Sequence, residues 1–554
     1  MRIALVQTTR VLTDYYSEKA YVPLNLLSLA SYLKERNFRP YVFDFNVLLP
    51  KGRLSKDFFK SAAKRILRCR PKAIGFSVTC ASLPASILVA NECKKLSPGV
   101  TVILGGQEVS FEEEAVLEAF RSIDIVVRGE GEATFTELLQ ALGSGMPLND
   151  ILGLTYRDKD QILRNPDRPF IEDLDSLPLL DFSLLPHIGR YEQGAVEAGR
   201  GCPYCCSFCA NSKMWKRSFR IKSPPRIVKE LKNACRLFKK DRDSFISIAH
   251  DNFLADRRAA ETFLDLMSRE KIAWSCSARV DLLDSKLIKN LRLAGCKRIF
   301  LGVETGSFKM QKAIRKNVPL NNICSILGCL EENGILAVPG VILGFPRETI
   351  KQIDQTLLLC LQMRISAPSS RMHMSLLILY KGSELFLKAR HKFSPCSLDI
   401  SEKIFPTISG LPAELKLARE YPLIFPSFNY LKNCSTDPGE LLRTKIIFGF
   451  LVAFLPRTTM ALIGELFASP FRLGQDIYEF LISEGLEWQH HSKQATYFKI
   501  KGSQEVFCAG KKVDAEEILI SENPEILSRV LKEYINMKAS NSIKRLFKSE
   551  IKCV

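Results

Sequence analysis

Three closely spaced cysteines form the part of the chain best suited to carry chemistry. Cys202, Cys206 and Cys209 follow the pattern C-x3-C-x2-C, with Cys205 as a fourth cysteine in the same stretch. Zinc sites usually collect four ligands from two separated pairs, and no matching second pair follows here. Three thiolates suit a [4Fe–4S] cluster with one iron left free to chelate the amino and carboxylate groups of a small molecule. The alternative is a chance group of buried thiols in a chain with 17 cysteines; Cys205 is expected to serve packing.

The cysteines follow the first of six β-rich runs that alternate with helix-like stretches. These runs are 195–198, 245–250, 274–278, 298–304, 338–344 and 372–380. Short runs rich in Val, Ile and Phe predict buried strands, and intervening helices make those strands parallel. The repeats predict an open, partial (β/α)6 barrel of the TIM type over residues 191–394, with its chemistry at the carboxyl ends of the strands.

A separate α/β pattern occupies residues 1–145. Strands are expected at 3–7, 40–45, 73–79, 101–104 and 123–127, with helix-like stretches between them. This alternation predicts a doubly wound, Rossmann-like parallel sheet with helices on both faces. Ligands of such sheets bind beyond the carboxyl ends of the strands, where Thr79, Gly105-Gly106 and Gly129–Glu132 would lie.

Two further regions lack this alternation. Residues 146–190 contain Pro147, Pro166, Pro169, Pro178 and Pro186, and this density predicts a linker without regular elements. Residues 395–554 have a mixed, mostly helical pattern and are expected to form a C-terminal domain related to the substrate. The expected parts of the chain are therefore 1–145, 146–190, 191–394 and 395–554.

The composition limits the possible classes of protein. With 554 residues, 46% hydrophobic and 25% charged, the chain is globular with two or three domains. A net charge of +19 attracts anions, but the basic residues are spread along the chain, so no nucleic-acid partner is expected. The cysteine usage and the absence of a signal-peptide pattern predict a cytoplasmic setting. The run Ile446–Leu455 is too short to span a membrane; it is either a core helix or a membrane-surface segment.

The cysteine triplet, with Phe208 before its last cysteine, resembles the signature of the radical S-adenosylmethionine (SAM) superfamily. Four later segments at predicted strand ends resemble the SAM-binding motifs of that family: His250–Phe253, Ser277–Arg279, Gly302–Ser307 and Gly340–Glu348. The resemblance implies that the three cysteines hold a [4Fe–4S] cluster. It also implies SAM contacts from Asp251, Asn252, Ser277, Arg279, Glu304, Ser307, Ile342 and Gly344. His250 is expected to line the SAM pocket, with a role as general base as the alternative.

Residues 1–145 resemble the cobalamin-binding domain found upstream of many radical SAM barrels, through Pro23–Leu26, Asp44, Leu104–Gly106 and Arg128–Glu132. The resemblance implies cobalamin contacts from Asp44, Thr79, Gly105, Gly106, Gly129, Glu130 and Gly131, since glycines let a bulky corrin approach the backbone. Relatives that ligate cobalt with histidine carry Asp-x-His-x-x-Gly, whereas this chain reads Asp44-Phe-Asn46. No imidazole from this domain is therefore expected on the cobalt. The alternative is a domain that has lost its ligand and braces the barrel.

These resemblances imply an enzyme that reductively cleaves SAM and, with cobalamin, methylates an unactivated carbon or a phosphorus. The substrate would be a small molecule, a lipid or a peptide, and an electron donor such as flavodoxin or ferredoxin would serve the cluster. Peripheral membrane contact follows if residues 446–455 lie on a membrane surface. One alternative is a non-methylating cyclase or rearrangement enzyme. The other is an iron–sulfur electron-transfer or regulatory binding protein. No catalytic side chain is predicted.

Overall fold

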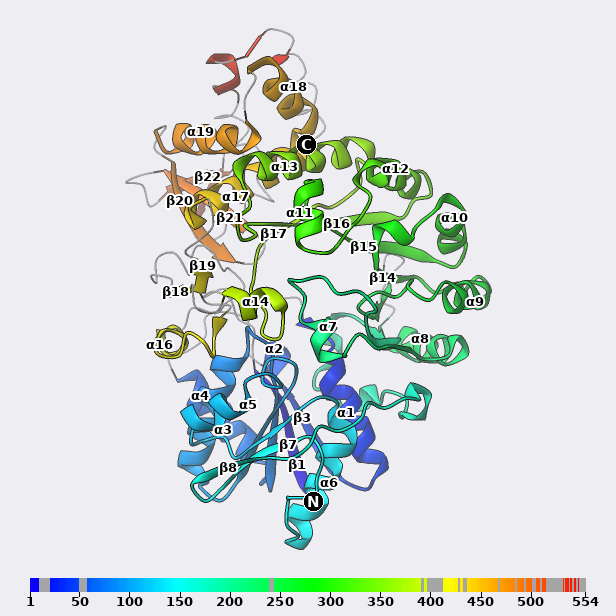
Figure 1. The fold of residues 1–554 in the computed structure, drawn as a ribbon, viewed down its shortest axis with the longest axis vertical. Coiled ribbons are helices and arrows are strands. Elements are labelled where there is room, and N and C mark those ends of the chain that lie inside the picture. Colours follow the sequence, from blue (N-terminus) through cyan, green and yellow to red (C-terminus); the bar gives the residue numbers. More distant parts are fainter. Residues whose placement is uncertain are drawn as a thin grey trace. The chain divides into compact units, whose positions relative to one another are not determined.

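The computed structural model describes residues 1–8, 20–48, 57–238, 244–389, 393–395, 412–426, 429–431, 436–466, 469–483, 486–492, 495–500, 505–508 and 511–514, and residues 532, 534–537, 539–540, 543–544 and 547. The chain divides into two compact units. The first comprises Met1–Cys276, Leu379–Pro395 and Thr407–Asn429, and the second comprises Ser277–Ile378, Cys396–Pro406 and Tyr430–Val554. Figure 1 labels the helices and strands of both.

The first unit contains a seven-stranded sheet in the order β3-β1-β4-β5-β6-β7-β8. Its parallel strands are β3 (Arg39–Asp44), β1 (Arg2–Gln7), β4 (Ala73–Ser77), β5 (Thr101–Gly105) and β6 (Ile125–Val127). Strand β1 pairs with both β3 and β4, so successive crossovers leave it in opposite directions. That reversal creates the switch point at which doubly wound sheets bind ligands beyond the strand ends. The predicted Rossmann-like sheet is confirmed.

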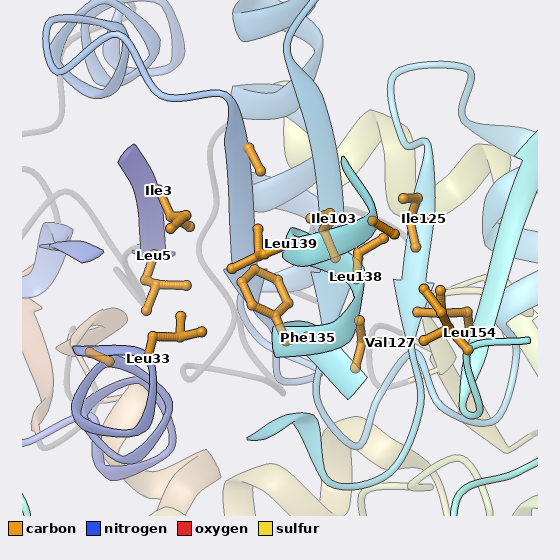
Figure 2. Close-up of a cluster of buried hydrophobic side chains, with 14 of the residues drawn as sticks. Ile3, Leu5, Leu33, Ile103, Ile125, Val127, Phe135, Leu138, Leu139 and Leu154 are labelled. Atoms are coloured by element: carbon orange, nitrogen blue, oxygen red, sulfur yellow. The ribbon is translucent and has the colours of Figure 1, made fainter. Parts of the chain in front are cut away.

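Helices cover both faces of this sheet (Figure 1). On one face α1 (Leu24–Glu35) packs with α6 (Gly131–Ser144); α3 (Phe58–Leu67) packs with α4 (Leu83–Leu96) on the other. Phe135 of α6 lies at the centre of the first core, together with Leu5 and Val127 of the strands (Figure 2). Gly75 of β4 makes room for this ring, because a Cβ there would lie 3.0 Å from Phe135 Cζ.

Strands β7 (Leu154–Asp158) and β8 (Gln161–Arg164) form an antiparallel hairpin that extends the sheet beyond β6. The prediction that residues 146–190 hold no regular element is therefore wrong for this stretch. The prolines that suggested a linker flank the hairpin rather than interrupt it, since Pro147 precedes β7 and Pro166 follows β8.

Each unit carries part of the second α/β pattern. In the first unit β10 (Ala195–Glu197), β13 (Ile246–Ala249) and the first three residues of β14 (Trp274–Arg279) run parallel in chain order. Helices α8 (Pro224–Phe238) and α9 (Arg257–Met267) lie between them in the chain. In the second unit β15 (Cys296–Glu304), β16 (Leu336–Leu343) and β17 (His373–Leu376) also run parallel in chain order. The repeated parallel βα units agree with the predicted partial barrel.

In the second unit, helices cover one face of β15 and β16. Helix α10 (Ser285–Leu293) packs on β15 and α12 (Ile323–Glu332) packs on β16, and α13 (Ile350–Ser366) follows β16 (Figure 1). The strand residues Leu301 and Val303 are fully buried. Their neighbours Phe300 and Glu304, which alternate with them, retain exposed surface. Phe300 and Glu304 therefore lie on the opposite face of the strand from Leu301 and Val303.

Shorter elements complete the first unit and part of the second. They are α2 (Phe45–Leu48), α5 (Glu113–Ala119), α7 (Asn211–Met214), α11 (Phe308–Ala313), α14 (Glu384–Ala389) and α16 (Pro412–Glu420), and the strands β2 (Ala20–Tyr21), β9 (Tyr191–Gln193), β11 (Gly199–Gly201), β12 (Phe219–Ile221), β18 (Phe393–Pro395) and β19 (Asn429–Leu431).

The C-terminal part of the second unit is mainly helical, as predicted. Helices α17 (Pro438–Phe454), α18 (Pro456–Leu466) and α19 (Pro470–Ser483) pack with α13. Two hairpins follow, β20 (Leu486–Ser492) with β21 (Ala495–Ile500) and β22 (Glu505–Cys508) with β23 (Lys511–Asp514). Among the described residues no single helix has the length and apolarity to cross a membrane; the pair Gly439–Ala453 and Pro456–Leu466 meets those criteria jointly, with a bend of 117°.

Candidate functional site

The predicted cluster ligands lie in a loop closed by a short hairpin in the first unit. Strands β11 and β12 pair antiparallel and bring the two ends of residues 202–218 together. Gly201 has a φ of +91°, and a Cβ at this position would overlap the carbonyl oxygen of Ser218. A Cβ at Gly199 would likewise overlap the carbonyl oxygen of Arg220. Only glycine lets the hairpin close this tightly at the entrance to the cysteine loop.

The three cysteines are grouped within this loop. Cys206 is buried, Cys202 and Cys209 are partly exposed, and the Cys209 amide donates to the Cys206 carbonyl at 3.1 Å. Burial, with smaller contributions from the neighbouring Cys206, Asp251 and Cys202, raises the pKa of the Cys209 thiol to about 12. A bound metal cation would lower the pKa of the thiol instead, because coordination deprotonates a thiol. The loop therefore favours neutral thiols without a metal and thiolates with one.

The C-x3-C-x2-C spacing of the three cysteines suits an iron–sulfur cluster. Among the described residues no three His, Cys, Asp or Glu side chains could hold one ion together. In a [4Fe–4S] cluster each thiolate binds a different iron, so the sulfur atoms stand further apart than around one zinc. The Cys202, Cys206 and Cys209 set is therefore retained as the candidate cluster site.

His250 holds the turn that follows β13. Its Nδ1 accepts a hydrogen bond of 2.9 Å from the Asn252 amide, and its ring lies 4.9 Å from the Phe219 ring of β12. Burial lowers the pKa of His250 to about 4, so the ring is neutral near pH 7. The lone pair of Nδ1 already accepts the hydrogen bond from the Asn252 amide, which disfavours a role for His250 as general base.

Asp251 reaches toward the cysteine loop from the same turn. Burial raises the pKa of this carboxyl, while hydrogen bonds from the Gly201 backbone and the Asn211 side chain act in the opposite direction. The structure thus brings predicted SAM contact Asp251 beside the predicted cluster ligands. Asn252 is buried in the same turn.

A buried ion network joins the cysteine hairpin to the glycine-rich edge of the first sheet. Arg200, two residues before Cys202, pairs with Glu130 at 2.7 Å and with Glu132 at 2.6 Å. Arg220 of β12 also pairs with Glu130, at 3.0 Å. Burial opposes ionisation of Glu132, yet Arg200 and its hydrogen bonds hold the pKa of this carboxyl below its usual value. All four side chains are more than nine-tenths buried, so the pairs are shielded from solvent.

The network gives Glu130 a role other than the one predicted from resemblance. Its carboxylate also accepts a hydrogen bond of 2.6 Å from the Ile171 amide. With Arg200, Arg220 and this amide, Glu130 connects three segments of the first unit. Direct contact between Glu130 and cobalamin stays a prediction, whereas its structural role is visible.

The other predicted cobalamin residues lie at the carboxyl ends of the parallel strands. Gly105 ends β5, Thr79 follows β4, and Gly106 has a φ of +114°. Gly129 follows β6 with a φ of +70°, and a Cβ there would meet no atom within 4 Å. Gly131 is nearly as open, with only Val127 at 4.0 Å. The open space beside Gly129 and Gly131, at the carboxyl edge of the parallel strands, fits the close approach of a large ligand such as cobalamin. A Cβ at Gly106 would instead meet the Val78 carbonyl oxygen at 2.5 Å.

Asp44, at the end of β3, is fully engaged within the protein. Its carboxylate accepts hydrogen bonds from the Asn46 amide at 3.0 Å, from the Asn46 side chain at 2.7 Å and from the Tyr191 hydroxyl at 3.1 Å. Asn46, where a cobalt-ligating histidine would stand, is thus held by Asp44. The chain therefore has an asparagine, not a histidine, at this position.

A segment after β17, residues 381–385, contacts two loops of the first unit, the loop after β5 and the cysteine loop. The sequence did not predict these contacts. Lys381 is buried, with its amine 3.7 Å from the Glu108 carboxylate in the loop after β5. A Cβ at Gly382 would overlap the Phe111 ring of the same loop. The Leu385 amide donates to the Ser207 carbonyl of the cysteine loop at 2.9 Å. No local pattern signals these contacts, because the partners lie far apart in the sequence.

In the second unit, two predicted SAM residues are linked by Lys316. Its amine pairs with Glu304 at 2.9 Å, and its carbonyl accepts a hydrogen bond of 2.7 Å from Arg279. Arg279 also pairs with Asp281 at 2.9 Å. A Cβ at Gly302 would lie 2.5 Å from Glu304 Oε1, so a larger residue would displace this pair of side chains. Lys316 was not predicted, because it lies outside the strand-end motifs.

The remaining predicted SAM residues lie at other strand ends. Ser277 lies within β14 and Ser307 precedes α11. Ile342 lies on β16, and Gly344 follows with a φ of +89°. The amide of Gly344 donates to Glu348 at 2.7 Å, and burial raises the pKa of the Glu348 carboxyl to about 7. These contacts fix the turn after β16.

Comparison with known proteins matches both regions. A model of the radical SAM superfamily matches residues 196–360, and a model of the B12 binding domain matches residues 16–139. A protein of Pyrococcus horikoshii named as an uncharacterized methyltransferase is 30% identical over 345 residues, which are 60% of this chain and 72% of that protein. The chain belongs to the radical SAM superfamily. It also carries a B12 binding domain, so the predicted family and its cofactors, SAM, a [4Fe–4S] cluster and cobalamin, are confirmed.

Two other similar proteins are a cyclase and a methyltransferase. The anaerobic magnesium-protoporphyrin IX monomethyl ester cyclase of Rubrivivax gelatinosus is 27% identical over 340 residues, which are 59% of this chain and 60% of that enzyme. The structure of the radical SAM methyltransferase TsrM from Kitasatospora setae, with cobalamin and a [4Fe–4S] cluster bound, aligns with a TM-score of 0.64 at 17% identity. That alignment covers 86% of this chain and 99% of TsrM. It shows a shared fold.

We expect Glu130→Gln to destabilise the first unit, because it leaves Arg200 and Arg220 buried with less compensating charge. The unfolding free energy should fall by about 3–5 kcal/mol, as for other broken buried pairs. Glu384→Gln, which disrupts an exposed pair with Lys388, is the control and should cost about 0–1 kcal/mol. Urea unfolding followed by circular dichroism measures both; equal small losses would contradict the buried network.

We expect His250 to make stability fall in acid. Its pKa is about 4 in the folded chain against an ordinary value of 6.5, so the unfolded state binds a proton first as the pH falls. The contribution to the unfolding free energy is complete above pH 6.5 and lost toward pH 4, by about 3 kcal/mol in total. The difference in unfolding free energy between wild type and His250→Asn, measured across this range, isolates the effect. A pH-independent difference would contradict it.

Proposed function

We propose that this protein is a cobalamin-dependent radical SAM methyltransferase that methylates an unactivated carbon or a phosphorus. The observation that carries the proposal is the buried network of Arg200, Arg220, Glu130 and Glu132. It fastens the cysteine loop to the open glycine edge of the first sheet within one unit. Methyl transfer with two cofactors requires their sites to be held at a fixed separation. The similarity to a relative named as a methyltransferase supports the same reaction.

In this proposal Cys202, Cys206 and Cys209 ligate the cluster, which supplies the electron that cleaves SAM. The hairpin formed by β11 and β12 holds the three side chains on one loop. The neutral His250 ring holds the adjoining turn in place by accepting a hydrogen bond from the Asn252 amide. Asp251 is positioned from this turn to accept hydrogen bonds from the SAM amino group.

In this proposal Thr79, Gly105, Gly106, Gly129 and Gly131 would hold cobalamin, which would supply the methyl group. Gly129 and Gly131 leave the backbone open at the carboxyl end of β6, where the corrin would approach. Because Asp44 holds Asn46 through two hydrogen bonds, the protein presents an amide where other cobalamin proteins present an imidazole. We expect the bound cofactor to show a spectrum without an imidazole ligand from this domain.

The SAM nucleoside contacts proposed in the second unit rest on the ion pairs there. Lys316 orients Glu304 so that one carboxylate oxygen remains for the ribose hydroxyls. Asp281 holds the Arg279 guanidinium by two hydrogen bonds. Ser277, Ser307, Ile342 and Gly344 are the other proposed contacts, and Asn252 belongs with Asp251 in the first unit.

Several finer features are also proposed. We propose the four-part division 1–145, 146–190, 191–394 and 395–554, with the last part near the substrate, which would be a small molecule, a lipid or a peptide. A flavodoxin or ferredoxin would reduce the cluster in the cytoplasm. Contact with a membrane surface would use the apolar helix α17, although its described residues Phe448 and Val452 are fully buried, which favours a core helix.

A second candidate is a cobalamin-dependent cyclase or rearrangement enzyme. The similarity to the Rubrivivax gelatinosus cyclase favours it. A methyltransferase consumes one SAM as methyl donor and releases S-adenosylhomocysteine, whereas a cyclase needs only the radical. The products of SAM therefore distinguish the two reactions.

We expect anaerobic reconstitution to load about four irons per chain, as a [4Fe–4S] cluster requires. The separate variants Cys202→Ala, Cys206→Ala and Cys209→Ala should each lose most of this iron, since each removes one ligand. Cys205→Ala is the matched control and should load normally. Iron analysis and electron paramagnetic resonance measure the result, and equal loss in Cys205→Ala would overturn the ligand assignment.

We expect the reduced holoenzyme to form both 5′-deoxyadenosine and S-adenosylhomocysteine from SAM. Chromatography of the reaction over time, with and without cobalamin, measures the two products. S-adenosylhomocysteine should disappear without cobalamin, because the methyl group travels on that cofactor. Formation of 5′-deoxyadenosine alone under saturating cobalamin would favour the cyclase instead.

A further inference from the structure

Lys381 carries an ammonium that the first unit buries without a hydrogen bond. Its side chain is 0% exposed, and its amine donates to no acceptor among the described residues. The ion pair with Glu108 spans 3.7 Å between amine and carboxylate, which is longer than a hydrogen bond. An ammonium has three N–H donors, and burying them unused costs free energy. An unsatisfied amine in the interior therefore points to a bound molecule that supplies the acceptor.

The carboxylate of Glu108 is in a matching situation. The side chain is 7% exposed, and no described residue donates a hydrogen bond to it. Burial raises the pKa of the Glu108 carboxyl, and the positive charge of Lys381 offsets this only in part. Burial also lowers the pKa of the Lys381 amine, with the charge of Glu108 acting in the opposite direction. The pair therefore lacks the hydrogen bonds that make a buried ion pair favourable.

The loop that carries Glu108 lies at the glycine edge of the first sheet. It follows β5, which ends at Gly105, one of the predicted cobalamin contacts. The Gly129 amide, at the end of β6, donates to the hydroxyl of Ser110 in this loop at 3.3 Å. Gly129 is also the glycine beside which the space is open. Glu108 and Lys381 therefore lie at the strand ends where cobalamin is expected.

The segment that carries Lys381 is fixed against the same loop. Gly382 has a φ of +78°, and a Cβ there would overlap the Phe111 ring. The Leu385 amide donates to a carbonyl of the cysteine loop at 2.9 Å. Lys381 thus stands where this segment meets both the glycine edge and the cysteine loop. It lies beyond both stretches that match the family models, which end at positions 139 and 360, so neither model assigns it a role.

We propose that Lys381 and Glu108 together bind a carboxamide on the rim of cobalamin. Cobalamin carries primary carboxamides around its corrin ring. The carbonyl oxygen of one such group would accept a hydrogen bond from the Lys381 amine, and its NH2 group would donate to the Glu108 carboxylate. The spacing of 3.7 Å between amine and carboxylate lets a single carboxamide reach both at ordinary hydrogen-bond lengths.

The chemistry of the pair favours a neutral ligand over a charged one. An anion would satisfy Lys381 but be repelled by Glu108, and a cation would do the reverse. A primary carboxamide is neutral and offers both an acceptor and donors, so it gives each charge a hydrogen bond and leaves their mutual compensation intact. The proposal rests on the cobalamin site of the proposed function, and it adds to that site a lysine from outside the B12 binding domain.

The first test measures the dissociation constant of hydroxocobalamin from the full chain with its reconstituted cluster, by anaerobic equilibrium ultrafiltration. Lys381→Met keeps the length of the side chain but removes its charge and its donors. We expect the dissociation constant to rise by about tenfold or more, the value of one hydrogen bond to a charged group. Lys388→Met, which removes an exposed lysine of α14, is the matched control and should bind as the wild type does. Equal binding by Lys381→Met and the wild type would overturn the proposal.

A second test separates contact with the cofactor from support of the fold. In the monocarboxylic acids of cobalamin one rim carboxamide is replaced by a carboxylate, at a different position in each derivative. Glu108→Gln removes the repelling charge and supplies an amide donor. One derivative should therefore gain affinity relative to cobalamin by about tenfold over the wild type. A purely structural role would change the affinity for every derivative equally, and that result would overturn the proposal.

Cobalamin uptake by the wild type distinguishes this proposal from the proposed function. If the wild type takes up no cobalamin under saturating supply, the cobalamin-dependent function fails together with this assignment. If the wild type and Lys381→Met bind cobalamin equally well, this assignment alone fails and the proposed function stands.

Discussion

Two buried arginines hold the cysteine loop against the edge of the first sheet. Arg200 and Arg220 stand on either side of the loop, and Glu130 and Glu132 stand at the start of helix α6. Moving any one of these ions into a low-dielectric interior alone would be expensive, so the four groups are stable only together. This mutual dependence fixes where the loop can lie. Leu385 and the glycine hairpin add backbone contacts to the same loop.

The features that the sequence could predict are local ones. Short apolar runs gave the parallel strands, because a strand buried on both faces must be continuously apolar. The spacing of Cys202, Cys206 and Cys209 indicated the cluster, because three donors on one loop need no distant partner. The glycines after β5 and β6 indicated a ligand edge, since Gly106 and Gly129 have a positive φ that favours glycine and the space beside Gly129 is open.

The features that the sequence could not predict depend on distant partners. Glu130 resembles a cofactor contact in its motif, and only the positions of Arg200 and Arg220 show that its carboxylate is already used. Lys381 stands in an otherwise ordinary segment, and its burial follows from how that segment packs. The hairpin of β7 and β8 was not predicted, because the high density of prolines in residues 146–190 argued against regular elements. The prolines lie outside the two strands.

The most direct test of the central claim is the dipolar coupling between the reduced cluster and cobalt(II) in bound cobalamin, measured by pulsed electron paramagnetic resonance. If the ion network fixes one loop against the other, the wild type should give a single narrow distance distribution. Replacing both Glu130 and Glu132 by glutamine should broaden it. A distribution that is broad in the wild type, or equally narrow after both replacements, would show that these four side chains do not set the separation.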